Sequence, residues 1–136
     1  MIVVDTGVLY ASIDRRDRSH VAVTEWLPEA TGPLVVPFAV LVETAQLVER
    51  RLCADALVSL LRTVDGGEPL LLVPDAVDLA RTAELVGRYA DLRLGLVDAT
   101  VVALAERLGV ATIATLDRRH FTVVRPLHVE SFNLVP

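Results

Sequence analysis

Short apolar runs alternate along this chain with longer segments whose apolar residues recur every three or four positions. Four runs have the length of buried strands: Ile2–Val4, Leu34–Val36, Leu70–Val73 and Ala111–Ala114. The tail from Val123 to Val135 is also apolar, although Pro126 interrupts it, and we expect it to add one edge strand. The pattern therefore predicts a sheet of four to five strands.

Helical spacing fills the segments between these strands. We expect helices over residues 6–13 and 20–29, one that starts at Pro37, one that ends at Gly66-Gly67, one that follows Asp75, and one over Leu96–Leu108. The predicted buried faces are Phe38, Leu41, Ala45, Val48 and Leu52; Leu57, Leu60, Leu61 and Val64; and Leu79, Ala83, Val86 and Ala90. Because strands that alternate with helices form parallel sheets covered on both faces, the pattern predicts a three-layer α/β/α fold.

Composition narrows the class of protein. The 136 residues suit one domain, and 53% of them are hydrophobic, with a mean hydropathy of +0.51. The longest apolar run, residues 34–42, is far shorter than the roughly 20 residues of a membrane-spanning helix. We therefore expect no membrane segment, and we attribute the excess apolar surface to a partner protein or a second subunit.

The cysteine content and the net charge restrict the class of protein further. The only cysteine, Cys53, allows no intrachain disulfide, and Asp5 interrupts the apolar N-terminus where a secretory signal would need a longer run, so we expect a cytoplasmic protein. The net charge is −5, and all 13 basic residues are arginine. An acidic chain does not bind nucleic acid through its whole surface, but it can carry a local arginine patch.

Four acids stand out by their positions. Asp5 and Asp117 follow predicted strands, Glu43 lies inside the helix after another strand, and Asp98 lies near the start of a helix. The carboxyl ends of parallel strands lie at one edge of the sheet, so we expect these side chains to converge there. Like charges disfavour ionisation of one another, and Mg²⁺ or Mn²⁺ bound by oxygen ligands resolves that conflict. The pattern predicts a metal-dependent enzyme that acts on phosphate.

Three of these acids have a structural alternative. Asp5, Asp98 and Asp117 could each cap the helix that follows, whereas Glu43 lies too far inside its helix to do so. We therefore keep helix capping open as a second interpretation of the three aspartates.

Two threonines and a short motif beside the acids also allow more than one interpretation. Thr6 and Thr115 could orient a carboxylate or a metal-bound water, or bond to backbone at a strand end. The run Asp5-Thr6-Gly7 matches the way aspartic proteases present their catalytic aspartate. That fold is almost all β, which conflicts with the helical periodicity of this chain, so we set the protease hypothesis aside.

Five motifs occur in a fixed order along the chain: Val3-Val4-Asp5-Thr6; Asp14, Asp17 and His20; Pro37 through Glu43-Thr44; Leu96-Val97-Asp98-Ala99; and Ala114 through Phe121. Each is weak alone, but the ordered set resembles the PIN-domain ribonucleases, and specifically the VapC-type toxins of type II toxin–antitoxin pairs. The resemblance runs nearly end to end and implies a single PIN domain over residues 1–136.

The resemblance implies a role for each matching residue. Asp5, Glu43, Asp98 and Asp117 match the metal-binding acids of the family, and Thr115 matches its frequent site threonine. One departure is Gly7, where many relatives have serine or asparagine, so a supporting polar contact is lost or comes from elsewhere.

The implied activity is Mg²⁺- or Mn²⁺-dependent hydrolysis of a phosphodiester in a tRNA or rRNA loop, leaving a 5′-phosphate and a 3′-hydroxyl. The implied toxin inhibits translation until a cognate VapB-type antitoxin neutralises it, and we expect the free chain to form a homodimer. RNA contacts could come from Arg15, Arg16, Arg118 and Arg119, which are otherwise ordinary solvated arginines. His120 and Phe121 are expected to dock the segment after Asp117 onto the domain.

Two other function classes stay open. One is a non-catalytic PIN-type module that binds RNA or protein without cutting. The other is a metal-dependent RNA-processing nuclease or phosphatase outside toxin–antitoxin biology.

Overall fold

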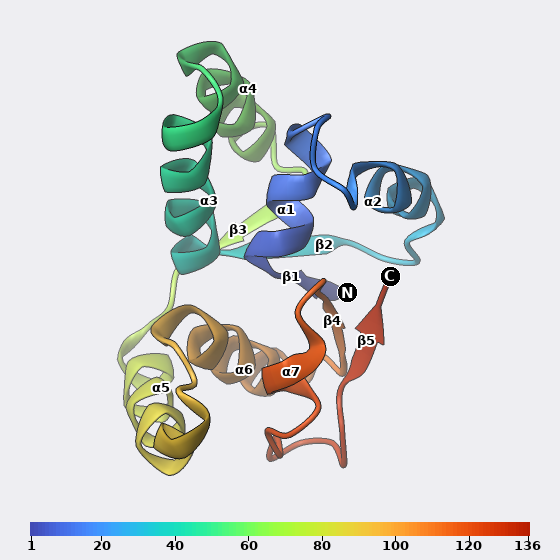
Figure 1. Ribbon diagram of the computed structural model, residues 1–136. Helices are drawn as coiled ribbons and strands as arrows, with labels where there is room; N and C mark the ends of the chain where they lie inside the picture. The colour runs from blue at the N-terminus through green and yellow to red at the C-terminus, as the bar shows by residue number, and fades with distance from the viewer.

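The computed structural model describes all 136 residues and places five parallel strands in one sheet (Figure 1). The strands are β1 (Ile2–Val4), β2 (Leu34–Pro37), β3 (Leu70–Leu72), β4 (Thr112–Ala114) and β5 (Asn133–Val135), in the spatial order β3-β2-β1-β4-β5. The central strand β1 pairs Ile2 with Leu34 of β2, and Val3 with Ile113 of β4. The predicted number of strands is confirmed, and the tail supplies the edge strand β5.

Helices cover both sides of this sheet. They are α1 (Thr6–Ile13), α2 (His20–Trp26), α3 (Phe38–Arg51), α4 (Ala54–Asp65), α5 (Ala76–Arg88), α6 (Leu96–Leu108) and α7 (Arg118–Phe121), with short 3₁₀ helices η1 (Leu27–Glu29) and η2 (Ala90–Leu92). In the view of Figure 1, α1 to α4 lie above the sheet and α5 to α7 lie below it. The three-layer α/β/α prediction is therefore confirmed. No helix combines the length and apolarity that crossing a membrane requires.

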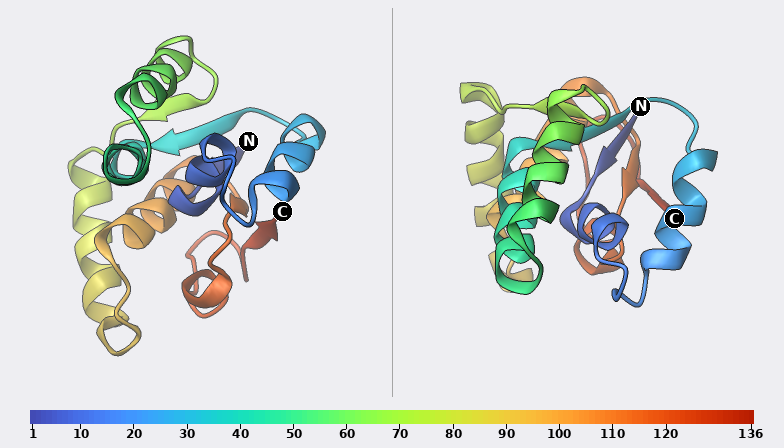
Figure 2. Two further views of the ribbon diagram at one scale, coloured as in Figure 1. Left: turned by 45° about the horizontal axis from the view of Figure 1, so that its top comes forward. Right: turned by 90° about the horizontal axis from the view of Figure 1, so that it is seen from above.

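The core lies between the sheet and its helices. Val3 of β1, Ile113 of β4 and Val8 of α1 are almost completely buried. Helix α6 is buried around much of its circumference, since it lies between the sheet and α5, and Figure 2 shows α5 running alongside α6. This packing holds the first turn of α6 near the carboxyl ends of β1 and β2.

The predicted buried face of α5 is wrong. Leu79, Ala83, Val86 and Ala90 are all exposed, whereas Asp78, Thr82 and Leu85 are buried. Ion pairs hold this helix against α6: Arg107 donates to Asp78 at 2.8 Å, and Arg81 donates to Glu106 at 2.7 and 3.0 Å. Because these charged pairs and the buried Leu85 turn the other side of α5 toward α6, the predicted apolar stripe faces solvent.

Three smaller predictions also need correction. Pro37 is the last residue of β2 and the N-cap of α3 rather than its first helical residue, because its backbone is extended and pairs with Leu72. Phe38 and Leu61, which we expected to be buried, are each 46% exposed. The predicted helix over residues 20–29 consists of α2 followed by η1, with Pro28 inside the 3₁₀ turn.

Candidate active site

Asp5 lies where β1 ends and α1 begins. Its side chain is 6% exposed. One carboxylate oxygen accepts the backbone N–H of Thr6 at 2.7 Å, and the other accepts the Thr115 hydroxyl at 2.8 Å. Asp5 is therefore the N-cap of α1, as the capping alternative proposed. The same position places it at the carboxyl edge of the sheet, so capping does not remove it from the site.

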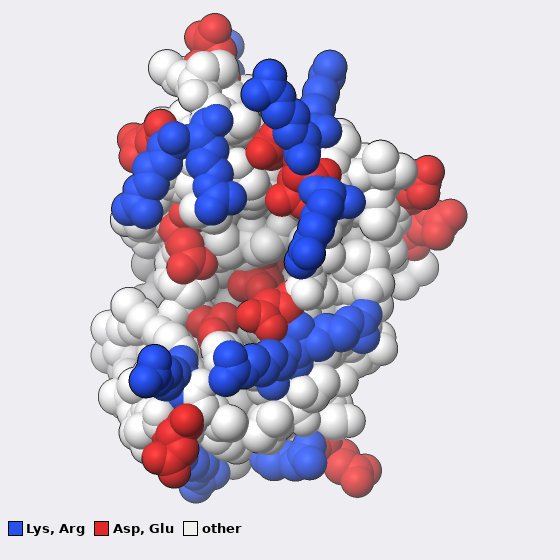
Figure 3. Space-filling view, in the orientation of Figure 1, with Lys and Arg blue, Asp and Glu red and all other residues white.

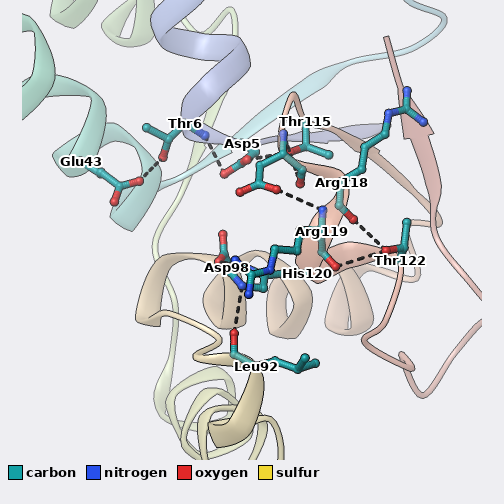
Figure 4. A network of polar contacts seen from close by, with 11 residues as sticks. Asp5, Thr6, Glu43, Leu92, Asp98, Thr115, Arg118, Arg119, His120 and Thr122 are labelled. Atoms are coloured by element: carbon teal, nitrogen blue, oxygen red, sulfur yellow. Dashed lines mark hydrogen bonds and ion pairs between the residues drawn. The ribbon is translucent and has the colours of Figure 1, made fainter.

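Glu43 comes to this edge from the second turn of α3. The Thr6 hydroxyl donates to Glu43 Oε2, which ties the start of α1 to α3. Figure 4 shows the carboxylates of Asp5, Glu43 and Asp98 bordering one space from three different elements. Thr6 bonds directly to a site carboxylate, as the orienting role expects. Thr115 bonds both to the Asp5 carboxylate and to the backbone of Asp117, so both alternatives hold for it.

Asp98 lies in the first turn of α6 and is not its N-cap, since Gly95 has that position. The capping alternative for Asp98 is therefore wrong. Its Oδ2 lies 2.7 Å from Nδ1 of His120, and Nε2 of the same ring lies 3.2 Å from the Leu92 carbonyl oxygen (Figure 4). His120 thus links α7 to α6 and to η2, as the docking prediction expected.

Asp117 opens α7 and is exposed. Its side chain accepts the backbone N–H of Arg119 at 3.0 Å, so its capping alternative is also correct. Its own backbone N–H donates to the Thr115 hydroxyl at 3.1 Å. One threonine therefore contacts both Asp5 and the loop that carries Asp117.

Burial and mutual repulsion make these acids hard to ionise together. Removal from water raises the pKa of Asp5 to about 6, although hydrogen bonds from Thr115 and Thr6 oppose the rise. The charges of Asp98 and Glu43 add to it. Burial likewise raises the pKa of Asp98; the hydrogen bond from His120 opposes the rise, while Asp117 and Glu43 add to it. The carboxylates are therefore close enough to act on one another.

The donor set fits a divalent cation. No arginine forms an ion pair with a site acid, and the only such contact is that of His120 with Asp98. With the side chains as they stand, no three His, Cys, Asp or Glu residues converge closely enough to coordinate one ion. Mg²⁺ commonly keeps several waters and binds through one or two carboxylates, which suits this open arrangement of oxygen donors.

Arginines surround the acidic centre. Figure 3 shows acidic side chains in a hollow, with basic side chains above and below it. Arg15, Arg16 and Arg119 are exposed. The guanidinium of Arg118 donates to the Pro136 carbonyl at 2.6 Å, so this arginine is directed toward the C-terminus rather than into the hollow.

His120 is the residue that the sequence interpretation missed as part of the site. It was assigned only to docking, yet its ring contacts Asp98 directly. A usable signal was its place three residues after Asp117, which is one helical turn.

Comparisons with known proteins identify the family of this chain. The family model of the PIN domain matches residues 2–125. The chain is 37% identical over 135 residues to Ribonuclease VapC26 of Mycobacterium tuberculosis, covering 99% of this chain and 100% of that protein.

Two solved structures share the fold. VapC20 of M. tuberculosis, described as a sarcin–ricin loop cleaving toxin, superposes with a TM-score of 0.82 at 21% identity, over 87% of this chain and 91% of that one. FitAcB of Neisseria gonorrhoeae gives a TM-score of 0.66 at 19% identity, over 89% and 91% of the two chains. A parallel sheet of this kind also rules out the aspartic-protease fold.

Proposed function

The chain belongs to the PIN-domain family, in its VapC ribonuclease group, and on that premise we propose that it is a Mg²⁺- or Mn²⁺-dependent endoribonuclease that acts as the toxin of a toxin–antitoxin pair. The observation that carries the proposal is that Asp5, Glu43 and Asp98 border one space, near enough for the charges of Asp98 and Glu43 to raise the pKa of Asp5, without a lysine or arginine partner. We also propose that residues 1–136 act as one PIN domain, because residues 126–136, beyond the family match, supply β5.

We assign the metal to four side chains: Asp5, Glu43, Asp98 and Asp117. A bound divalent ion supplies a lowered pKa for an attacking water and stabilises charge on the phosphate oxygens. The chain's own contribution is to hold these oxygens in place. Thr115 holds Asp5 and the Asp117 loop, and Thr6 holds Glu43. The hydrogen bonds that Asp5 receives from Thr115 and from the Thr6 backbone also oppose the rise in its pKa.

We propose that the substrate is a structured RNA loop of tRNA or rRNA. Single-stranded loops expose bases and backbone that a duplex hides, and arginines at the border of the hollow supply phosphate contacts. Arg15, Arg16 and Arg119 are the candidates with exposed side chains, whereas Arg118 would first have to leave the Pro136 carbonyl. The description of VapC20 as cleaving the sarcin–ricin loop supports the rRNA choice by fold analogy alone. Inhibited translation would follow from either target.

We propose that a VapB-type antitoxin covers the apolar groove between α1, α2 and α4. This groove has a volume of about 980 Å³, and its lining combines apolar residues such as Val8, Leu27 and Leu60 with polar ones such as Arg15 and Thr63. A groove of this composition accepts the apolar face of a helix. Such a partner, with the toxin itself, would act in the cytoplasm.

A homodimer would use a second apolar surface, around the edge strand β3 and the outer face of α5. Val73, Val77 and Leu79 are 64%, 72% and 55% exposed there. Exposed apolar side chains in this segment of the chain favour a protein contact. A monomer by light scattering at micromolar concentration would contradict the dimer, and Val77→Asp should weaken it.

The ribonuclease proposal is tested by cleavage of total cellular RNA with Mg²⁺ or Mn²⁺ against EDTA. Discrete metal-dependent fragments are expected from the wild-type protein and not from Asp98→Asn or Glu43→Gln. Glu49→Gln is the matched control, because Glu49 is an exposed residue of the same helix six positions away and faces elsewhere. If folded, metal-loaded wild-type protein free of antitoxin cuts nothing, the enzyme assignment fails and a binding module becomes the better account.

A further inference from the structure

His120 is the one residue of the site whose side chain contacts a proposed metal-binding acid without being such an acid or a threonine. Its side chain is 17% exposed, and its ring lies between two oxygens from different elements, Oδ2 of Asp98 on α6 and the Leu92 carbonyl of η2. A carbonyl oxygen only accepts hydrogen bonds, so Nε2 must carry a hydrogen toward Leu92. With the ring fixed in this way, Nδ1 lies 2.7 Å from Asp98 Oδ2: it donates to an ionised carboxylate when both ring nitrogens carry hydrogen, and accepts from a protonated carboxyl when only Nε2 does.

This contact determines how Asp98 presents itself. Its Oδ2 is occupied by the imidazole, so Oδ1 is the oxygen left for another ligand. A carboxylate held on one oxygen loses rotational freedom and keeps a single orientation. The half-buried Asp98 makes no other side-chain hydrogen bond, so His120 alone restrains its carboxylate.

The same ring also anchors α7. That helix has only four residues and begins with Asp117 as its N-cap, so its position depends on tertiary contacts. Phe121 attaches it to the core, at 2% exposed, and the ring of His120 attaches it to α6 and η2. Loss of the ring would therefore disturb Asp98 directly and Asp117 through its helix.

We propose that His120 is a positioning residue of the metal site: it orients Asp98 and holds the helix that carries Asp117, and it contacts neither the metal nor the RNA. This inference rests on the proposed metal-dependent function. The chain offers conservative variants that separate the two bonds. His120→Asn keeps an N–H donor at the place of Nδ1, His120→Gln keeps one near the place of Nε2, and His120→Ala removes both.

The experiment is a calorimetric titration of each purified variant with Mn²⁺, with thermal unfolding and RNA cleavage measured on the same samples. Partners of this kind typically change metal affinity by about 10- to 100-fold, so we expect His120→Ala to weaken Mn²⁺ binding at least about tenfold. His120→Asn should recover most of that loss and His120→Gln should not. His128→Gln is the histidine control, because His128 bonds only the Val110 carbonyl, and it should bind Mn²⁺ like the wild type.

Two results would overturn the inference. One is wild-type Mn²⁺ affinity in folded His120→Ala, and the other is His120→Asn binding no better than His120→Gln. If His120→Ala does not fold, the Mn²⁺ affinities of His120→Asn and His120→Gln are sufficient to test the inference. A wild-type protein that binds Mn²⁺ but cuts no RNA would contradict the ribonuclease proposal instead, and the Mn²⁺ titrations would still test His120.

Discussion

Asp5→Asn should make the metal-free protein more stable at neutral pH while it abolishes RNA cleavage. The reason is that Asp5 is buried, receives no cation from the chain, and is repelled by Asp98 and Glu43. Asparagine removes that charge and keeps the shape of the side chain. At this residue the same substitution therefore raises the stability of the protein and removes its activity. Such a conflict is expected where a binding site holds like charges close together.

The size of the effect follows from the pKa of Asp5. It rises from 3.8 to about 6 on folding, and one pKa unit corresponds to about 1.4 kcal/mol, so ionisation of Asp5 costs the folded state roughly 3 kcal/mol. The folded protein binds more protons than the unfolded chain between pH 3.8 and 6. The uncharged form of Asp5 therefore contributes its full stabilisation of the wild-type fold below pH 3.8, and this contribution is lost as the pH rises through 6.

The hydrogen bonds that Asp5 forms can be maintained by an asparagine at this position. The amide oxygen can still accept the backbone N–H of Thr6. The new amide nitrogen can donate to the Thr115 hydroxyl, which can in turn donate its hydrogen to the Asp117 carbonyl oxygen 3.1 Å away. The hydrogen-bonding groups that contact Asp5 each keep a partner, so the charge effect should decide the sign.

The assay is urea unfolding of both proteins in EDTA from pH 4 to pH 8. We expect the variant to be more stable by about 2–3 kcal/mol at pH 8 and the difference to shrink toward zero at pH 4. Mn²⁺ should stabilise the wild type more than the variant. Asp75→Asn is the control of opposite sign, because hydrogen bonds to Asp78 and Val77 backbone lower the pKa of Asp75. Equal stability of wild type and Asp5→Asn across this pH range would refute the reasoning.

Three further predictions concern single side chains. Thr115→Val should weaken Mn²⁺ binding and cleavage about tenfold or more, since Asp5 loses its hydroxyl donor; calorimetry and RNA cleavage measure both. Arg107→Ala should lower the free energy of unfolding by roughly 1–2 kcal/mol, because buried Asp78 loses its ion pair while Arg107 is itself partly solvated; urea unfolding tests this. Gly7→Ala should raise stability by about 0.5–1 kcal/mol and leave cleavage intact, since a Cβ there only touches Leu116 at 3.4 Å; an unfavourable change would contradict it.

Much of this fold was predictable because its signals are local. The strands are short apolar runs bounded by turns or helix starts, and the inner strands of this parallel sheet are largely buried, so Ile2–Val4 and Leu34–Val36 are recognisable from residue type alone. Asp5 and Asp117 are placed by the same logic, because Asp5 directly follows β1, Asp117 follows β4 after two residues, and each caps a helix. Parallel topology then brings their strand ends to one edge.

Tertiary contacts decided what local patterns could not. The apolar stripe of α5 predicted the wrong buried face, because Asp78 and Arg81 find charged partners on α6, which come from residues more than 20 positions away. The contact between His120 and Asp98 joins residues 22 positions apart and depends on how α7 packs against α6. The sequence by itself determined which residue types end each strand; only the folded chain determined which of them meet, because a polar side chain is buried wherever a distant partner compensates its lost hydration.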